Sequence, residues 1–99
     1  MKRVVITGAG TINALGHNVA ETLVAMRSGT CGIGALEFRD VERLDITIGG
    51  QVKGFEAEGH FNRQQMTLYD RFTQFTLMAA KEAISQSGIE FSGALADRA

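Results

Sequence analysis

The feature that most constrains the fold is a β-branched run near the start of the chain, Val4–Thr7, which ends at Gly8-Ala9-Gly10. The run shows no alternation of apolar and polar residues. This pattern is typical of a strand buried on both faces, usually in a parallel or mixed sheet that helices cover. The glycines allow the backbone to turn without a Cβ penalty. The opening therefore predicts a strand, a turn and an α/β architecture.

Two helices are predicted from their caps and from an apolar period of 3.6 residues. Asn18 is the expected N-cap of the first, with Glu21 three residues later completing a capping box and Gly29 at the C′ position. The second runs from residue 70 to residue 87 and ends at Gly88. Its apolar face is wider than that of a simple surface helix. Its polar side is formed by Asp70, Gln74, Lys81 and Ser85.

Between these helices, residues 46–55 have a period of two, which predicts a half-buried strand with Ile46 and Ile48 on one face and Thr47 and Gly49 on the other. Residues 29–45 are expected to form a long charged connection, and the residues after Gly88 a polar tail. The predicted order is strand, helix, strand, helix. Such an α/β start has more apolar surface than its own elements can cover.

Composition limits the classes of protein that this chain can belong to. A length of 99 residues allows one domain at most, with a modest core. Lys plus Arg number 10 against 11 Asp plus Glu, without a block of like charges, which argues against a nucleic-acid or membrane-surface partner. The single cysteine, Cys31, suits a reducing compartment, and the apolar run at Val4 is too short for a signal peptide or a membrane span. We expect a cytoplasmic protein.

The glycine-rich turn invites comparison with a dinucleotide site. Gly8 and Gly10 would supply the first two glycines of such a site, but Asn13 stands at the third position. The expected helix start at Asn18 lies well after the turn, so the helix N-terminus is not directed at it. A plain turn is favoured, and a nucleotide-binding domain remains the weaker alternative.

Three residues are candidates for chemistry. Cys31 lies just past the end of the first predicted helix, where the helix dipole disfavours a thiolate. His17 precedes an N-cap and His60 lies in a loop, and neither has a Cys or carboxylate at metal-ligand spacing. All three are interpreted as loop residues. The residues themselves therefore predict no catalytic, metal-binding or cofactor-binding site.

Three segments together resemble the β-ketoacyl synthases, the condensing enzymes of fatty-acid and polyketide synthesis. Residues 4–10, followed by Gly16, are similar to that family's opening strand and turn. Residues 28–33 are similar to its Gly-x-Ser-Gly-Ile loop, in which Cys31 takes the serine position. Residues 70–88 are similar to its long helix. The resemblance covers nearly all of the chain in the same order and spacing.

The resemblance implies a thiolase-like layered α/β fold, of which residues 1–99 would be an incomplete N-terminal domain, and a homodimer for the complete enzyme. It also implies a decarboxylative Claisen condensation that uses a cysteine and two histidines from later motifs, so Cys31, His17 and His60 match none of them. Family members often carry several basic residues before the long helix, a stretch associated with the acyl carrier protein. Here only Arg63 and Arg71 could make that contact.

Three hypotheses follow. The chain is the first part of a condensing enzyme, or a non-enzymatic remnant or partner module that packs on a complete synthase, or a nucleotide-binding domain. The first is favoured, with no condensation activity expected of the 99 residues alone.

Overall fold

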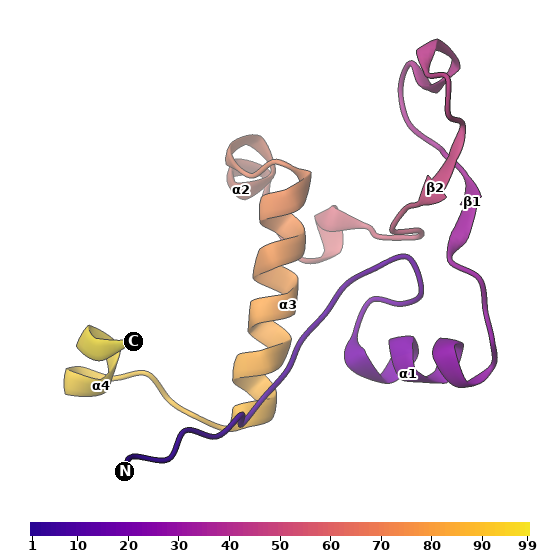
Figure 1. The fold of residues 1–99 in the computed structure, drawn as a ribbon. Helices are drawn as coiled ribbons and strands as arrows, with labels where there is room; N and C mark the ends of the chain where they lie inside the picture. The colour runs from indigo at the N-terminus through magenta and orange to yellow at the C-terminus, as the bar shows by residue number, and fades with distance from the viewer.

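The computed structural model describes residues 1–99, with α3 as its longest element. Figure 1 shows α3 standing at the centre, the segment that follows the first residues running along it, and the two strands projecting as a hairpin away from it. The elements in chain order are α1 (Val19–Arg27), β1 (Ile33–Ala35), the 3-10 turn η1 (Val41–Arg43), β2 (Ile48–Gly50), the 3-10 turn η2 (Ala57–Gly59), α2 (Arg63–Leu68), α3 (Arg71–Ser87) and α4 (Gly93–Arg98).

The core is small. Only three residues are buried, namely Phe55, Ala57 and Gln74. The radius of gyration is 17.0 Å, whereas a compact domain of this length would have about 13 Å. The elements are therefore spread out, and most apolar side chains remain accessible.

Helix α1 forms as its caps predict, with one difference in the capping box. The Asn18 side chain accepts a hydrogen bond from the backbone N–H of Glu21 (2.8 Å). The Glu21 carboxylate accepts from the N–H of His17 (2.7 Å) and not from that of Asn18. The reason is the bend at Gly16, whose backbone lies against Glu21 and brings His17 within reach. At the other end Gly29 adopts a φ of 69°, as expected of a C′ glycine.

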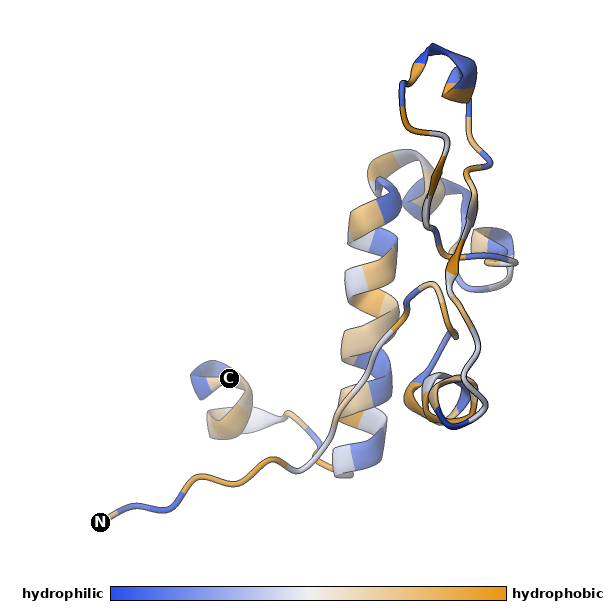
Figure 2. Ribbon diagram, turned by 45° about the vertical axis from the view of Figure 1, so that its right-hand side comes forward, coloured by the Kyte–Doolittle hydropathy of each residue, from blue (hydrophilic) through white to orange (hydrophobic).

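The prediction of a strand at Val4–Thr7 is wrong for this chain. The segment is extended but pairs with no other strand, and Val4, Val5 and Ile6 are 95, 69 and 92% exposed. In Figure 2 this segment is the orange, hydrophobic stretch near the N-terminus, which lies beside no other strand. A strand forms only where a neighbour satisfies its N–H and C=O groups, and the chain supplies no such neighbour here.

The second predicted strand is confirmed only in part. Of residues 46–55, just Ile48–Gly50 form β2, which pairs antiparallel with β1 so that Gly34 lies opposite Gly49. The strand β1 lies in the segment that was expected to be an irregular connection. Of its two faces, the one with Gly49 packs under the Leu36 side chain, whereas Ile46 and Ile48 on the other are exposed.

Helix α3 confirms the longest prediction. The Asp70 side chain accepts from the N–H of Thr73 (3.2 Å), and Gly88 ends the helix at a φ of 68°. One residue on the expected polar side is misplaced, because Gln74 is only 5% exposed and Phe72 is 71% exposed. Gln74 is buried because the connection from α2 folds over it.

Two short helices were not predicted. Helix α2 has a complete capping box, in which Asn62 and Gln65 bond each other's backbone N–H groups (2.8 and 3.0 Å). Helix α4 lies in the expected polar tail. None of the helices combines the length and the apolar character that crossing a membrane requires.

Candidate functional site

The glycine-rich turn is a helix-packing site. A Cβ atom on Gly8 would lie 2.1 Å from the carbonyl oxygen of Ala83, and one on Gly10 would lie 1.9 Å from that of Ala79. Between them the N–H of Ala9 donates to the side-chain oxygen of Gln86 (2.7 Å). The backbone of α3 thus occupies the space that a pyrophosphate would need beside this turn. The geometry favours the plain turn over the nucleotide site.

Glu82 fastens the next part of the same segment to α3. One carboxylate oxygen accepts from the N–H of Thr11 and the other from the N–H of Val19, both at 3.0 Å. Val19 begins α1, and the first N–H groups of a helix have no partner within the helix. This role is not predictable from the sequence, because no local pattern connects a helix glutamate to amides more than sixty residues away.

The two histidines do meet, but on a phenyl ring. The edge of His17 contacts Phe55 (ring centroids 6.1 Å apart), and His60 stacks on the same ring in parallel (5.6 Å). His17 Nε2 also bonds the carbonyl oxygen of Lys53. Phe55 is 8% exposed, so the histidines act here as parts of its cover. His60 also lines the open groove beside α3 that is described below. Neither histidine belongs to a group of side chains that could hold a metal ion.

Arg71, one of the two residues expected to contact a carrier protein, lies over the same aromatic group. Its guanidinium carbon is 5.0 Å from the Phe55 centroid and 5.1 Å from the Phe75 centroid. A cation over an aromatic face is worth about 0.5–1 kcal/mol at an exposed site. Arg63, the other residue, is the first residue of α2 and is exposed. The structure places the two near the same helix corner in different surroundings.

Cys31 lies past the end of α1, as predicted, in the loop between α1 and β1. It is exposed, and its Sγ lies 3.8 Å from the carbonyl oxygen of Ile33. Its contact with a backbone oxygen supplies neither a base nor a cation, which a reactive thiol requires.

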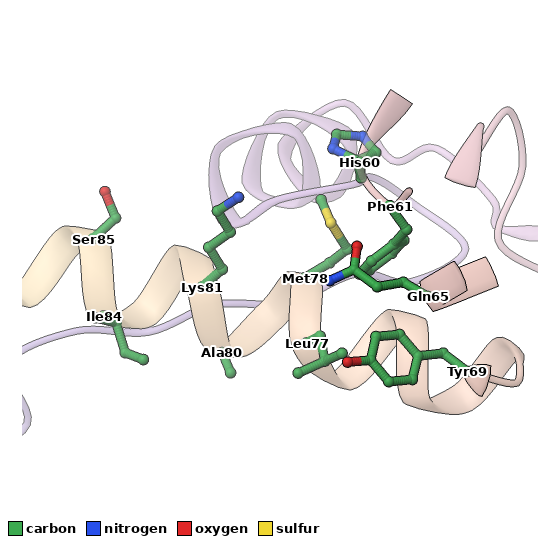
Figure 3. A pocket seen from close by; sticks show the side chains of 10 residues that line it. All are labelled: His60, Phe61, Gln65, Tyr69, Leu77, Met78, Ala80, Lys81, Ile84 and Ser85. Atoms are coloured by element: carbon green, nitrogen blue, oxygen red, sulfur yellow. The ribbon is translucent and has the colours of Figure 1, made fainter. Parts of the chain in front are cut away.

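An open groove of about 520 Å³ follows one side of α3 and the end of α2 (Figure 3). Phe61, Tyr69 and Leu77 form much of its wall, and Lys81 lies at its edge. It runs along the side of α3 turned away from the Gly8–Gly10 contact, because Leu77 lies about half a helical turn from Ala79, and Lys81 about half a turn from Ala83. Helix α3 thus has two apolar faces, one covered and one open.

Comparison with known proteins decides which family these features belong to. A family model described as "Beta-ketoacyl synthase, N-terminal domain" matches residues 1–97. The chain belongs to the β-ketoacyl synthase family. The family resemblance seen in the sequence is thereby confirmed.

Named relatives agree with this assignment. The chain is similar to 3-oxoacyl-[acyl-carrier-protein] synthase 2 of Staphylococcus aureus strain N315, with 34% identity over 97 residues, 98% of this chain and 23% of that protein. It is also similar to the synthase 2 of Vibrio cholerae serotype O1, with 32% identity over 89 residues, 90% of this chain and 22% of that protein. The chain therefore spans about a quarter of the length of these synthases.

Proposed function

We propose that this chain is the N-terminal part of a β-ketoacyl-[acyl-carrier-protein] synthase. The complete enzyme would join an acyl thioester to a malonyl-carrier thioester by decarboxylative Claisen condensation, in fatty-acid or polyketide biosynthesis. The observation that carries the proposal is the family match along residues 1–97, together with relatives that are 3-oxoacyl-[acyl-carrier-protein] synthases.

The role that we propose for these 99 residues is scaffold without a catalytic group. Cys31 is exposed beside a backbone carbonyl, and His17 and His60 cover Phe55. Acyl transfer and decarboxylation require a nucleophile, a base and a group that stabilises the developing negative charge, all held together. The three quarters of the relatives that have no counterpart here are where we place those groups.

The complete enzyme is proposed to be a cytoplasmic homodimer with a thiolase-like layered fold, in which residues 1–99 are an incomplete N-terminal domain. Two features support the layered arrangement. The Val4–Thr7 segment is extended with both edges free, and α3 has an open apolar face as well as a covered one. A strand between neighbours and a helix between layers would cover both.

The partner that we propose is acyl carrier protein, named as a substrate partner by the relatives' own description. The surface offered to it would be the corner of α2 and α3, with Arg63 and Arg71 as its cations. Both side chains are exposed there. Cations at the rim of an interface mainly speed association and fix its orientation.

The gene downstream of codon 99 tests the proposal most directly. We expect the reading frame to continue with a strand and then a cysteine on a sharp turn, and a stop codon at that point would count against it. The isolated 99-residue chain is predicted not to convert acyl and malonyl thioesters into a β-ketoacyl product. Measurable turnover by the isolated chain would overturn the scaffold role.

The alternative, a self-standing partner module, predicts a different behaviour in solution. A cooperative unfolding transition of the isolated chain would favour the module, whereas a chain without such a transition would favour the enzyme segment. We expect no cooperative transition, because only three of its residues are buried.

A further inference from the structure

The best-packed part of the chain is the corner at which α2 meets α3. The three buried residues, Phe55, Ala57 and Gln74, all belong to it. Helix α2 is only six residues long, so its own hydrogen bonds cannot hold it in place. Its position is set by the contacts that hold the chain segments before and after it.

The segment that enters α2 is gripped at Phe55. The Arg71 guanidinium lies over this ring and over that of Phe75, and the Phe55 and Phe75 rings meet edge to face at 5.4 Å. From Phe55 the chain passes through η2, which packs on α2 and holds Ala57 at 2% exposure. Three residues after η2 comes Asn62, the N-cap of α2. Arg71 therefore acts on the start of α2 through Phe55.

The segment that leaves α2 is gripped by Gln74. Its Nε2 donates to the carbonyl oxygen of Tyr69, the C-cap of α2, at 3.2 Å. The Phe61 and Tyr69 rings, one before α2 and one after it, meet edge to face at 5.9 Å. The two side chains that hold these segments, Arg71 and Gln74, both belong to the first turn of α3.

We propose that Arg71 is a positioning residue that fixes α2 on α3, and that Arg63 is the one of these two arginines that contacts the carrier protein. This inference rests on the proposed function and divides the roles of the two arginines. The guanidinium carbon of Arg71 lies within about 5 Å of two phenyl rings, and the attraction of the cation to both ring faces holds the side chain against them. Arg63 opens α2 with an exposed side chain, and no ring or carboxylate of this chain holds it.

The first test measures KM for the acyl carrier protein with the complete enzyme. Arg63→Gln is expected to raise KM by about two- to fivefold, the usual effect of one exposed charge. Arg71→Gln should raise it to a similar extent because α2 shifts. Phe55→Leu, which removes no charge, should do the same. The double variant Arg63→Gln/Arg71→Gln should be no worse than Arg63→Gln alone, because Arg71 acts through Arg63.

Arg39→Gln is the matched control. This arginine is exposed and lies in the hairpin loop between β1 and β2, so its loss removes one charge without touching α2, and KM should stay unchanged. A rise in KM with Arg71→Gln but not with Phe55→Leu would overturn the proposal, as would additive effects in the double variant. An unchanged KM with Arg63→Gln would overturn the contact. If Phe55→Leu lowers the yield of folded enzyme, Phe75→Leu removes the second ring at a less buried position.

The second test needs no activity and uses the complete enzyme. Protons on the Arg71 side chain lie over two rings, so their NMR signals should be shifted upfield in the native chain and return toward ordinary values in Phe55→Leu. An unshifted Arg71 signal in the native chain would overturn the positioning role. Failure of the proposed function would look different, because the complete wild-type protein would then show no condensation at all.

Discussion

Two groups of segments differ in how they relate to α3. Residues 8–19 and residues 55–70 are fastened to it, the first by Glu82 and Gln86 and the second by Arg71 and Gln74. The Val4–Thr7 segment and the β1–β2 hairpin are not, and each stands away from the helix in Figure 1. The hairpin has only three residues in each strand and leaves Ile33, Ile46 and Ile48 more than half exposed.

The difference shows which structure a chain of this size can complete by itself. The fastened segments are held at single points, either a backbone group or an aromatic ring. A single side chain of α3 is enough to make each of these contacts. The free segments are the extended Val4–Thr7 stretch and a two-stranded hairpin, and a stable sheet needs a continuous row of partner groups and a covered face. Side-chain anchors are available within 99 residues, whereas a neighbour for Val4–Thr7 and a covered face for the hairpin are not. Amide hydrogen exchange of the complete enzyme follows the fastened contacts residue by residue.

The largest effect is expected from Gly10→Ala, which should turn a fastened segment into a free one. The added Cβ would lie 1.9 Å from the carbonyl oxygen of Ala79, a backbone atom that cannot move without disturbing α3. The cost should reach the upper end of the ~1–3 kcal/mol that overpacking usually causes. In the complete enzyme, hydrogen exchange at the backbone amides of Thr11 and Val19, both bonded to Glu82, should be faster than in the wild type.

Gly59→Ala is the control, because nothing lies within 4 Å of the position that its Cβ would take. It adds the same methyl group at a glycine of η2 and should leave Thr11 and Val19 unaffected. Equal exchange rates at Thr11 in the two variants would show that the contact between Gly10 and α3 does not fasten the segment.

A smaller effect of the same kind is expected from Glu82→Ala. It leaves two backbone N–H groups, those of Thr11 and Val19, without their acceptor. An unsatisfied buried donor costs about 1–3 kcal/mol, and these two are only partly buried, so about 1–2 kcal/mol in total is expected. Glu82→Gln keeps one oxygen acceptor and should retain the protection of one of the two amides. If both amides lost their protection from exchange in Glu82→Gln, the negative charge of Glu82 would contribute more to these contacts than the position of its oxygens.

Local signals in the sequence predicted much of the helical part of the fold. Asn18, Asp70 and Gly88 sit at helix ends as expected, because a cap depends on residues within one turn of itself. The capping box at Asn62 carried the same signal and was overlooked. The strands were predicted less well, because the partner of β2 and the missing neighbours of Val4–Thr7 are set by distant parts of a chain, which periodicity does not describe.

In the candidate site, too, local features were predictable from the sequence and long-range contacts were not. The sequence placed Cys31 beyond a helix end, and the structure agrees. The meeting of His17 and His60 on Phe55 joins segments that are more than thirty residues apart, and no spacing rule connects them. Burial of Gln74 likewise depends on how α2 folds over α3. The carrier contact of Arg63 and Arg71 stays a prediction.

The smallest effect is expected from Asn62→Ala, which tests whether α2, one of the fastened segments, can unfold separately from α3. It removes the side-chain acceptor of the Gln65 N–H and frees the Gln65 side chain from the Asn62 N–H, at a cost of about 1 kcal/mol. Hydrogen exchange should accelerate in α2 and not in α3, whose N-terminus has its own cap in Asp70. Gln64→Ala, an exposed position in the same helix, is the control. Faster exchange through the first turns of α3 in Asn62→Ala would mean that the two helices unfold as one unit, and that α2 supports α3 as much as α3 holds α2.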